Sequence, residues 1–253
     1  MKKEIYIFFT ALIFFTRIPC PKWVNHDPSY LYKSSKYLPL IGIIVGSIGA
    51  ITFYLSHLIF SIEIAIILSM FSTIYTTGGF HEDGFADVCD GFGGGWTKDK
   101  ILSIMKDSTL GTYGVLGLLL ILGLKFSAIR EITPEKIIIT IISAHALSRF
   151  IATSLLYTHE YVRDTETSKV KPTSKKLETS QLIIAAFIGF IPLLAFKSFY
   201  VFLVFIPAYI SKMLLGIKFK KWIGGQTGDC AGAVQQVSEV IIYLSFIILW
   251  KFI

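Results

Sequence analysis

Residues 37–60 read YLPLIGIIVGSIGAITFYLSHLIF, a stretch without a single Asp, Glu, Lys or Arg. About 20 such residues are enough for a helix to cross the hydrocarbon core of a bilayer. Of the 253 residues in the chain, 53% are hydrophobic and 16% are charged, whereas ordinary soluble domains carry about 25% charged residues. The sequence therefore predicts an all-α, polytopic membrane bundle of about 6–8 helices.

Comparable apolar stretches continue along the chain at 62–80, 110–130, 137–157, 181–196, 198–216 and 237–252. No hinge or low-complexity linker separates them, so we expect residues 1–253 to form a single integral membrane domain. The first hydrophobic stretch, 4–18, is short and has no small-residue cleavage signal. We expect residues 1–36 to form an interfacial N-terminal segment, and a short true span is the alternative.

Most basic residues lie in a few polar loops. The net charge is +7, and 15 of the 24 Lys and Arg residues fall in the segments 17–36, 98–106, 163–176 and 218–221. Two candidate spans separate each pair of successive segments, so all four segments lie on one side of the membrane. Basic loops face the cytoplasm under the positive-inside rule. The positive charge is thus a topological signal, and we expect no nucleic-acid partner.

An acidic cluster interrupts this apolar pattern. Residues 78–95 read GGFHEDGFADVCDGFGGG, in which Asp83, Asp87 and Asp90 are spaced i, i+4 and i+7. On a helix that spacing places the three carboxylates on one face, where they repel one another. A divalent cation held between the carboxylates and a substrate phosphate would relieve this repulsion, and Mg²⁺ prefers such oxygen ligands. The alternative is a polar helix end exposed to water.

The glycines that close this stretch and a neighbouring histidine are further candidates. We expect Gly91, Gly93, Gly94 and Gly95 to break the helix and to free backbone N–H groups for an anion. Gly93 and Gly94 are therefore candidates for phosphate binding. His81 is either a general base or phosphate contact, or only a helix-capping residue.

Four polar residues outside the cluster are also candidates. Lys106 is either a phosphate contact or a lysine that snorkels to the membrane surface, and Asp107 closes the same loop beside the substrate. Arg149 lies inside an apolar run, where an unpaired charge is expensive, so we expect it to pair with phosphate or with an aspartate. Asp229 is either part of the site or an ordinary N-cap. We expect the glycine-rich loop 224–229 to meet the acidic cluster as the second half of one site.

Several longer motifs occur in order along the chain. They are FFTRIP at 14–19, PLIGIIVG at 39–46, GGFHEDGFADVCDG at 78–91, IMKDS at 104–108, Ser148–Arg149 and GGQTGD at 224–229. In this combination the chain resembles the cobalamin synthase family over essentially its full length. Glu82 stands where leucine is usual in that family, Thr109 where arginine is usual, and Gln236 where an acid is common. We therefore assign no role in the reaction to these three side chains.

The resemblance implies a reaction and its substrates. Adenosylcobinamide-GDP would be attacked by the ribose 3′-hydroxyl of α-ribazole, or of its 5′-phosphate, giving adenosylcobalamin or its 5′-phosphate and releasing GMP. One of the aspartates or His81 would accept the hydroxyl proton, and Lys106 and Arg149 would contact phosphate. The implied ligands of Mg²⁺ are Asp83, Asp87, Asp90 and Asp229.

The resemblance also implies a location. We expect an integral, multi-pass protein of the cytoplasmic (inner) membrane of a prokaryote, with its active-site loops facing the cytoplasm. The lipid bilayer is then a partner, and the sequence is equally compatible with a monomer and with an oligomer.

Two other functions fit part of the sequence. A CDP-alcohol phosphotransferase also cleaves a nucleotide diphosphate with aspartates at a membrane face, but Asp87 replaces an arginine of that family's motif. A cation-coupled transporter would carry its acidic residues in the middle of spans, whereas here they stand at span ends beside glycines. The residues leave open which carboxylate acts as the base and whether one or two metal ions bind.

Overall fold

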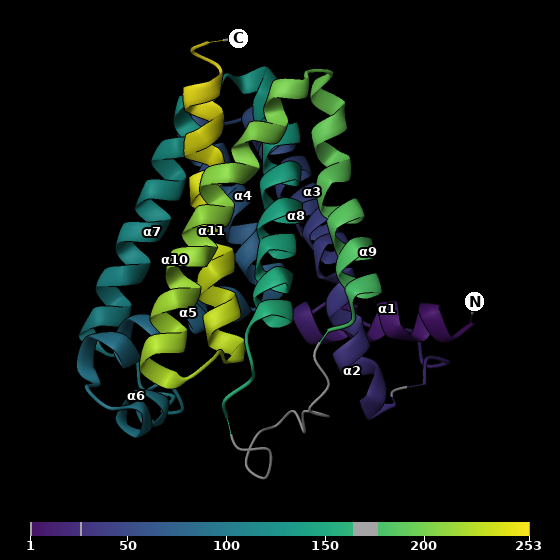
Figure 1. Cartoon of the computed structure of the whole chain (residues 1–253). Helices are drawn as coiled ribbons and strands as arrows, with labels where there is room; N and C mark the ends of the chain where they lie inside the picture. The colour runs from purple at the N-terminus through teal and green to yellow at the C-terminus, as the bar shows by residue number, and fades with distance from the viewer. Residues whose placement is uncertain (1, 26, 164–176, 253) are drawn as a thin grey trace.

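The computed structural model describes residues 2–25, 27–163 and 177–252 and is helical throughout (Figure 1). Within those residues the only strand-like pairing is an isolated bridge between Tyr161 and Gln226. The helices are α1 (Lys2–Phe15), α2 (Pro28–Ser34), α3 (Leu38–His57), α4 (Ile62–Thr77), α5 (Phe80–Gly94), α6 (Lys98–Ile104), α7 (Thr112–Glu131), α8 (Pro134–Thr158), α9 (Thr179–Phe190), α10 (Phe205–Ile223) and α11 (Gly228–Leu249). Short 3₁₀ turns, η1 (Ser35–Tyr37), η2 (Ile191–Phe196) and η3 (Phe199–Val204), lengthen α3, α9 and α10.

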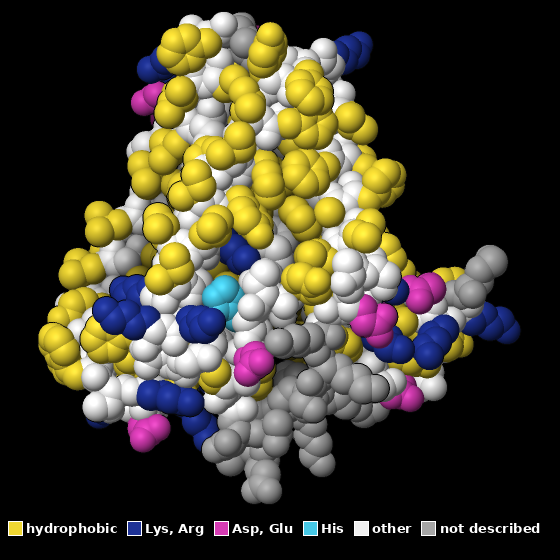
Figure 2. All heavy atoms as spheres, viewed as in Figure 1, with side chains coloured by type: hydrophobic (Ala, Val, Ile, Leu, Met, Phe, Trp, Pro, Cys, Tyr) yellow, Lys and Arg dark blue, Asp and Glu magenta, His cyan; other side chains and the backbone are white. Residues whose placement is uncertain are grey.

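Six helical segments are long and apolar enough to cross a membrane, by length and composition. They contain α3, α7, α8, α9 with η2, η3 with α10, and α11. Figure 2 shows hydrophobic side chains over the upper part of the molecule and many of the charged ones in its lower part, near α1, α2 and α6. The predicted all-α, polytopic membrane bundle is confirmed, and the chain is an integral membrane protein.

The expected span 62–80 is only partly correct. Helix α4 ends at Thr77, and α5 leaves it at an angle of 88°. Two successive glycines make the bend, because Gly78 and Gly79 have φ angles of 69° and 73°, a left-handed conformation that other residues adopt at a cost. Helix α5 therefore lies across the end of the bundle instead of continuing through it.

The last span also begins earlier than expected, at Gly228 rather than at 237. The first three turns of α11 carry glycine, alanine and glutamine, which lower the hydropathy of a sequence window. Most of these side chains are nonetheless buried, with Gln235 and Gln236 among them. Small residues and buried amides thus replace aliphatic ones at the end of α11 that faces α5, where packing matters more than lipid contact.

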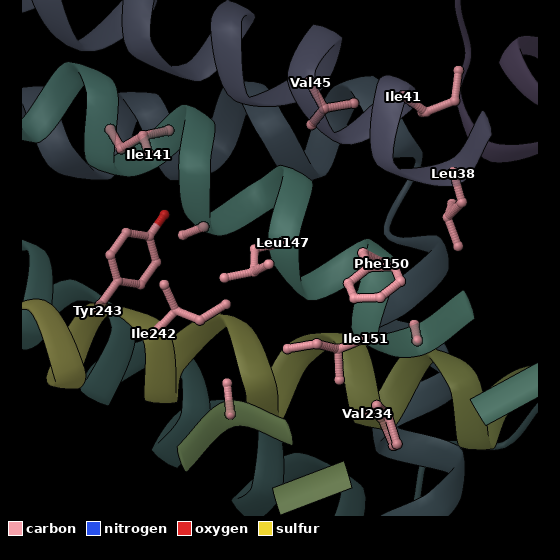
Figure 3. Packing of buried hydrophobic residues seen from close by; sticks show 14 of the residues in the cluster. Leu38, Ile41, Val45, Ile141, Leu147, Phe150, Ile151, Val234, Ile242 and Tyr243 are labelled. Carbon is pink, nitrogen blue, oxygen red and sulfur yellow. The ribbon is translucent and has the colours of Figure 1, made fainter. Parts of the chain in front are cut away.

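The centre of the bundle is formed by α3, α8 and α11, with α8 between the other two (Figure 3). Helices α3 and α8 approach closely because α3 has glycines on the contact face. A Cβ on Gly42 would collide with the backbone of His145, and a Cβ on Gly46 would lie 2.9 Å from the Cα of Ile142. Such small residues allow van der Waals packing between helices in a bilayer, where no hydrophobic drive holds them together.

Helix α1 lies crosswise at the same end of the bundle as α2 and α6 (Figure 1). It has 14 residues and is not among the segments long enough to span. Lys36 Nζ lies 2.6 Å from Glu4 Oε2 and ties α1 to the residues before α3. The orientation is the one expected of an interfacial helix, but contact of residues 1–36 with a membrane surface stays a prediction.

A buried ionic cluster joins three of the spanning helices. Lys125 Nζ on α7 lies 2.5 Å from Glu239 Oε1 on α11, with side-chain exposures of 3% and 1%. His145 Nε2 on α8 lies 3.4 Å from the same oxygen. Gln235 Nε2 donates to Glu239 Oε2 at 2.5 Å and to Ser148 Oγ at 3.1 Å. We call Lys125, His145, Glu239, Gln235 and Ser148, together with Arg149, the central polar cluster.

Removal of the Lys125 charge should destabilise the bundle strongly. Lys125→Met leaves the Glu239 carboxylate buried without its cation, which we expect to cost about 3–5 kcal/mol. Arg130→Met is the matched control, because Arg130 on the same helix pairs with Glu63 at an exposed position. The measurement is the midpoint of SDS-induced unfolding in mild detergent. Equal midpoints for the two variants would contradict a stabilising role of the cluster.

Candidate functional site

The acidic helix α5 and the N-terminus of α11 meet at one place. A Cβ on Gly84 would lie 2.9 Å from the Cα of Asp229, and a Cβ on Gly232 would lie 3.2 Å from the carbonyl oxygen of His81. Glycine at both positions lets the two backbones come almost into contact. The expectation that the loop 224–229 meets the acidic cluster is therefore confirmed.

Asp87 is the electrostatic centre of this junction. It is half-buried on α5, and burial together with the nearby carboxylates of Asp229 and Asp83 raises its pKa to about 7. Arg163 opposes this shift by lowering the pKa of Asp87, and Asp90 makes the smallest contribution to raising it. A carboxyl group normally titrates near pH 4, so burial first and the neighbouring carboxylates second disfavour the charged form of Asp87, and a bound cation would favour it.

Arg163 belongs to this junction although the sequence marked it only as one of many loop cations. Its Nη2 lies 2.5 Å from Asp229 Oδ2 and donates to the carbonyl oxygen of Met105 at 3.0 Å. The backbone next to it is pinned to the loop before α11, because Val162 N–H donates to the Gln226 carbonyl at 3.0 Å. No local pattern identifies Arg163, since its partners are 58 and 66 residues away in the chain.

Asp90 does not share the position of the other two aspartates. Its carboxylate is buried, and its oxygens accept the N–H groups of Gly111 at 2.8 Å and of Gly114 at 2.9 Å. It therefore caps the N-terminus of α7 from outside that helix. A Cβ on either glycine would collide with the carboxylate. This geometry gives Asp90 a structural role at the start of α7, and its expected roles as a Mg²⁺ ligand and as a catalytic group stay predictions.

The expected glycine loop is wrong. Helix α5 continues through Gly91 and Gly93 and ends at Gly94, so the backbone there is helical and not an open anion cradle. The glycines instead permit close packing: a Cβ on Gly93 would lie 2.5 Å from the ring of Tyr113, and one on Gly91 equally close to Met105. Phosphate binding by Gly93 and Gly94 was expected from an open loop with free backbone N–H groups, and both glycines lie in helix α5 instead. Their binding of phosphate stays a prediction.

His81 and Arg149 also turn away from the aspartates. Both are buried, and His81 packs against the Phe15 ring while facing the charges of the central polar cluster. Arg149 Nη1 is 2.9 Å from His145 Nδ1 and donates to the His145 carbonyl oxygen at 3.1 Å. The expected pairing of Arg149 with an aspartate is therefore not formed. Its contact with phosphate, and a catalytic role of His81, have no geometric support.

Lys106 and Asp107 lie on the exposed connection between α6 and α7. The Asp107 carboxylate accepts the N–H of Thr109 at 3.0 Å, and hydrogen bonds from the Thr109 side chain and backbone hold the pKa of Asp107 below its usual value. Lys106 follows Met105, whose carbonyl is bound by Arg163. The connection thus borders the junction of α5 and α11, and substrate contacts by Lys106 and Asp107 stay predictions.

The residues at the junction fit a magnesium ion that is shared with a substrate. Within the described part of the chain, no three His, Cys, Asp or Glu side chains could hold a metal ion by themselves. Mg²⁺, however, is usually bound by one or two carboxylates with waters and substrate phosphate oxygens. The carboxylates of Asp83 and Asp229 lie close enough to raise the pKa of Asp87, and the three side chains supply oxygen donors of this kind.

Comparison with known proteins agrees with the family resemblance of the motifs. The profile of the family described as cobalamin-5-phosphate synthase matches residues 7–247. A protein of Shewanella frigidimarina named adenosylcobinamide-GDP ribazoletransferase is 45% identical over 245 residues, 96% of this chain and 94% of its own. One of the same name from Shewanella oneidensis is 42% identical over 249 residues, 97% of this chain and 95% of its own. No solved structure matches. The chain therefore belongs to the cobalamin-5-phosphate synthase family.

Proposed function

We propose that this protein is an adenosylcobinamide-GDP ribazoletransferase that works with Mg²⁺. In this reaction the ribose 3′-hydroxyl of α-ribazole, or of its 5′-phosphate, attacks the phosphorus attached to the cobinamide. The bond from that phosphorus to the GMP oxygen breaks, the hydroxyl proton passes to a protein carboxylate, and GMP leaves. The observation that carries the proposal is that the carboxylates of Asp83 and Asp229 act on Asp87 at one junction, in a chain 45% identical to a relative of that name.

The residues divide the work as follows. Asp83 and Asp87 hold Mg²⁺, and Asp229 either joins them or orients Arg163. Bound Mg²⁺ would neutralise the diphosphate and lower the repulsion among the carboxylates. Arg163 and Lys106 supply positive charge for the departing GMP, and the Asp87 carboxylate, half-buried near Asp83 and Asp229, is our candidate acceptor of the hydroxyl proton.

The orientation in the membrane follows from charge. The acidic junction and most basic loops lie at one end of the bundle, and basic loops are retained in the cytoplasm. The active site then opens to the cytoplasmic side of the inner membrane of a prokaryote, where nucleotide substrates are present.

Loss of the Asp87 carboxylate should abolish the reaction. Asp87→Asn removes both the negative charge and the proton acceptor with little change in size, and we expect GMP release to fall at least about a hundredfold. Asp99→Asn is the control, because Asp99 is an exposed acid on α6 outside the site. The assay combines purified protein in detergent with adenosylcobinamide-GDP, α-ribazole and Mg²⁺. Full activity of Asp87→Asn, or no GMP release from the unmodified protein, would overturn the proposal.

The variant Asp90→Asn distinguishes between two roles of Asp90, a cap of helix α7 and a ligand of Mg²⁺. Asparagine keeps one acceptor oxygen, so one of the two bonds to the start of α7 survives and we expect a loss of about 1 kcal/mol in unfolding free energy. The Mg²⁺ concentration for half-maximal activity should stay unchanged. A rise of about tenfold or more in that concentration would instead make Asp90 a ligand.

A further inference from the structure

A pocket opens beside the bend between α4 and α5. It has a volume of about 590 Å³ and is lined by Arg17, Thr77, Gly78, Gly79, Phe80, Asp83, Ala86, Leu110 and Leu118. These residues come from the chain just after α1, the end of α4 and the bend, the first half of α5, and the segment that leads into α7 together with its first turns. Asp83 links the pocket to the acidic junction, so a group bound in the pocket lies next to the carboxylates.

Arg17 is held firmly in the wall of this pocket. Its backbone N–H donates to the Thr76 carbonyl oxygen at 2.8 Å, which fixes the chain after α1 to the end of α4. Its guanidinium packs on the backbone at Gly78, where a Cβ would lie 2.6 Å from Nε, and it stands 5.8 Å from the centre of the Tyr75 ring. The left-handed glycine at position 78 therefore both makes the bend and leaves room for this arginine.

The guanidinium has no anionic partner of its own. Among the described residues, Arg17 forms no ion pair, and neither does Asp83. The two opposite charges line one pocket without neutralising each other. A group that satisfies both is a phosphate, with one oxygen on the arginine and another on a cation held by the aspartate.

We propose that Arg17 binds the diphosphate of the nucleotide-activated substrate in this pocket. The inference rests on the proposed function, since it names a further contact for the same reaction. Carboxylates alone would repel a diphosphate, and a guanidinium recognises two phosphate oxygens at once with fixed geometry. The apolar wall formed by Phe80, Leu110 and Leu118 accommodates a carbon chain attached to the phosphate.

Two other roles of Arg17 make different predictions. As a cation at the C-terminus of α4 it would only stabilise that helix. As an exposed arginine near the membrane surface it would bind the phosphate of an anionic lipid. The phosphate chemistry is common to lipid and substrate, so the experiment compares membranes with and without anionic lipid.

The test uses the full-length protein in nanodiscs of either phosphatidylcholine or phosphatidylglycerol. The variants are Arg17→Gln, Arg17→Lys and Arg130→Gln. Arg17→Lys keeps the positive charge but cannot bind two phosphate oxygens in one plane as a guanidinium does. Arg130→Gln is the matched control, because it removes an exposed arginine elsewhere in the chain. Apparent KM values are measured for adenosylcobinamide-GDP and for α-ribazole. Separately, thermal stabilisation by inorganic diphosphate with Mg²⁺ is measured, which requires no turnover.

Loss of one charged hydrogen bond should raise the KM for adenosylcobinamide-GDP about tenfold to a hundredfold in Arg17→Gln. The KM for α-ribazole should not change, Arg17→Lys should be intermediate, and Arg130→Gln should equal the unmodified protein. The rise should occur in both lipids, and stabilisation by diphosphate should disappear in Arg17→Gln.

Several results would overturn the inference. They are an unchanged KM for adenosylcobinamide-GDP, an equal rise for both substrates, an effect confined to phosphatidylglycerol, or diphosphate stabilisation retained in Arg17→Gln. If that variant does not fold, the same comparisons are made with Arg17→Lys. Unmodified protein that binds diphosphate through Arg17 but releases no GMP would reject the proposed reaction while supporting this contact.

Discussion

The ion pair between Lys125 and Glu239 is the interaction on which the rest of the structure depends. In the apolar interior of a bundle a lone charge is expensive, so each of these side chains requires the other. The pair joins α7 to α11. His145 on α8 and Gln235 on α11 also contact the Glu239 carboxylate, so α8 is tied to the same group. The register of α11 is fixed in this way, and the first turn of α11 carries Asp229.

The same cluster reaches the acidic helix. Gln236 Nε2 on α11 donates to Glu82 Oε1 on α5 at 2.9 Å, so a side-chain hydrogen bond also connects these two helices. Glu82 and Gln236 are two positions at which the chain departs from its family pattern, and here they bond to each other.

Glycines decide how near the functional side chains come. Gly84 places α5 against Asp229, and Gly78 and Gly79 turn α5 across the end of the bundle. An α5 that continued straight from α4 would carry its aspartates away from α11. The bend and the close contact together bring the carboxylates of Asp83 and Asp229 near Asp87, which is the physical reason for the cation that we propose there.

The amino-acid sequence by itself determined the class of fold, the existence of the acidic face, and the family. Hydropathy is a local property, so long apolar runs identify spans without tertiary information, and the spacing of Asp83 and Asp87 alone predicts a shared helix face. Ordered motifs over the whole chain were enough to identify the family, as its profile match confirms.

The tertiary structure alone decided how equivalent-looking residues differ. Asp90 continues the stripe of Asp83 and Asp87 but caps α7, because the start of α7 lies against that turn of α5. Arg149 joins the central polar cluster, and Arg163 reaches Asp229 from a loop. These assignments depend on contacts between residues far apart in the chain, and a linear pattern carries no information about which backbone groups or charges will be nearest in space.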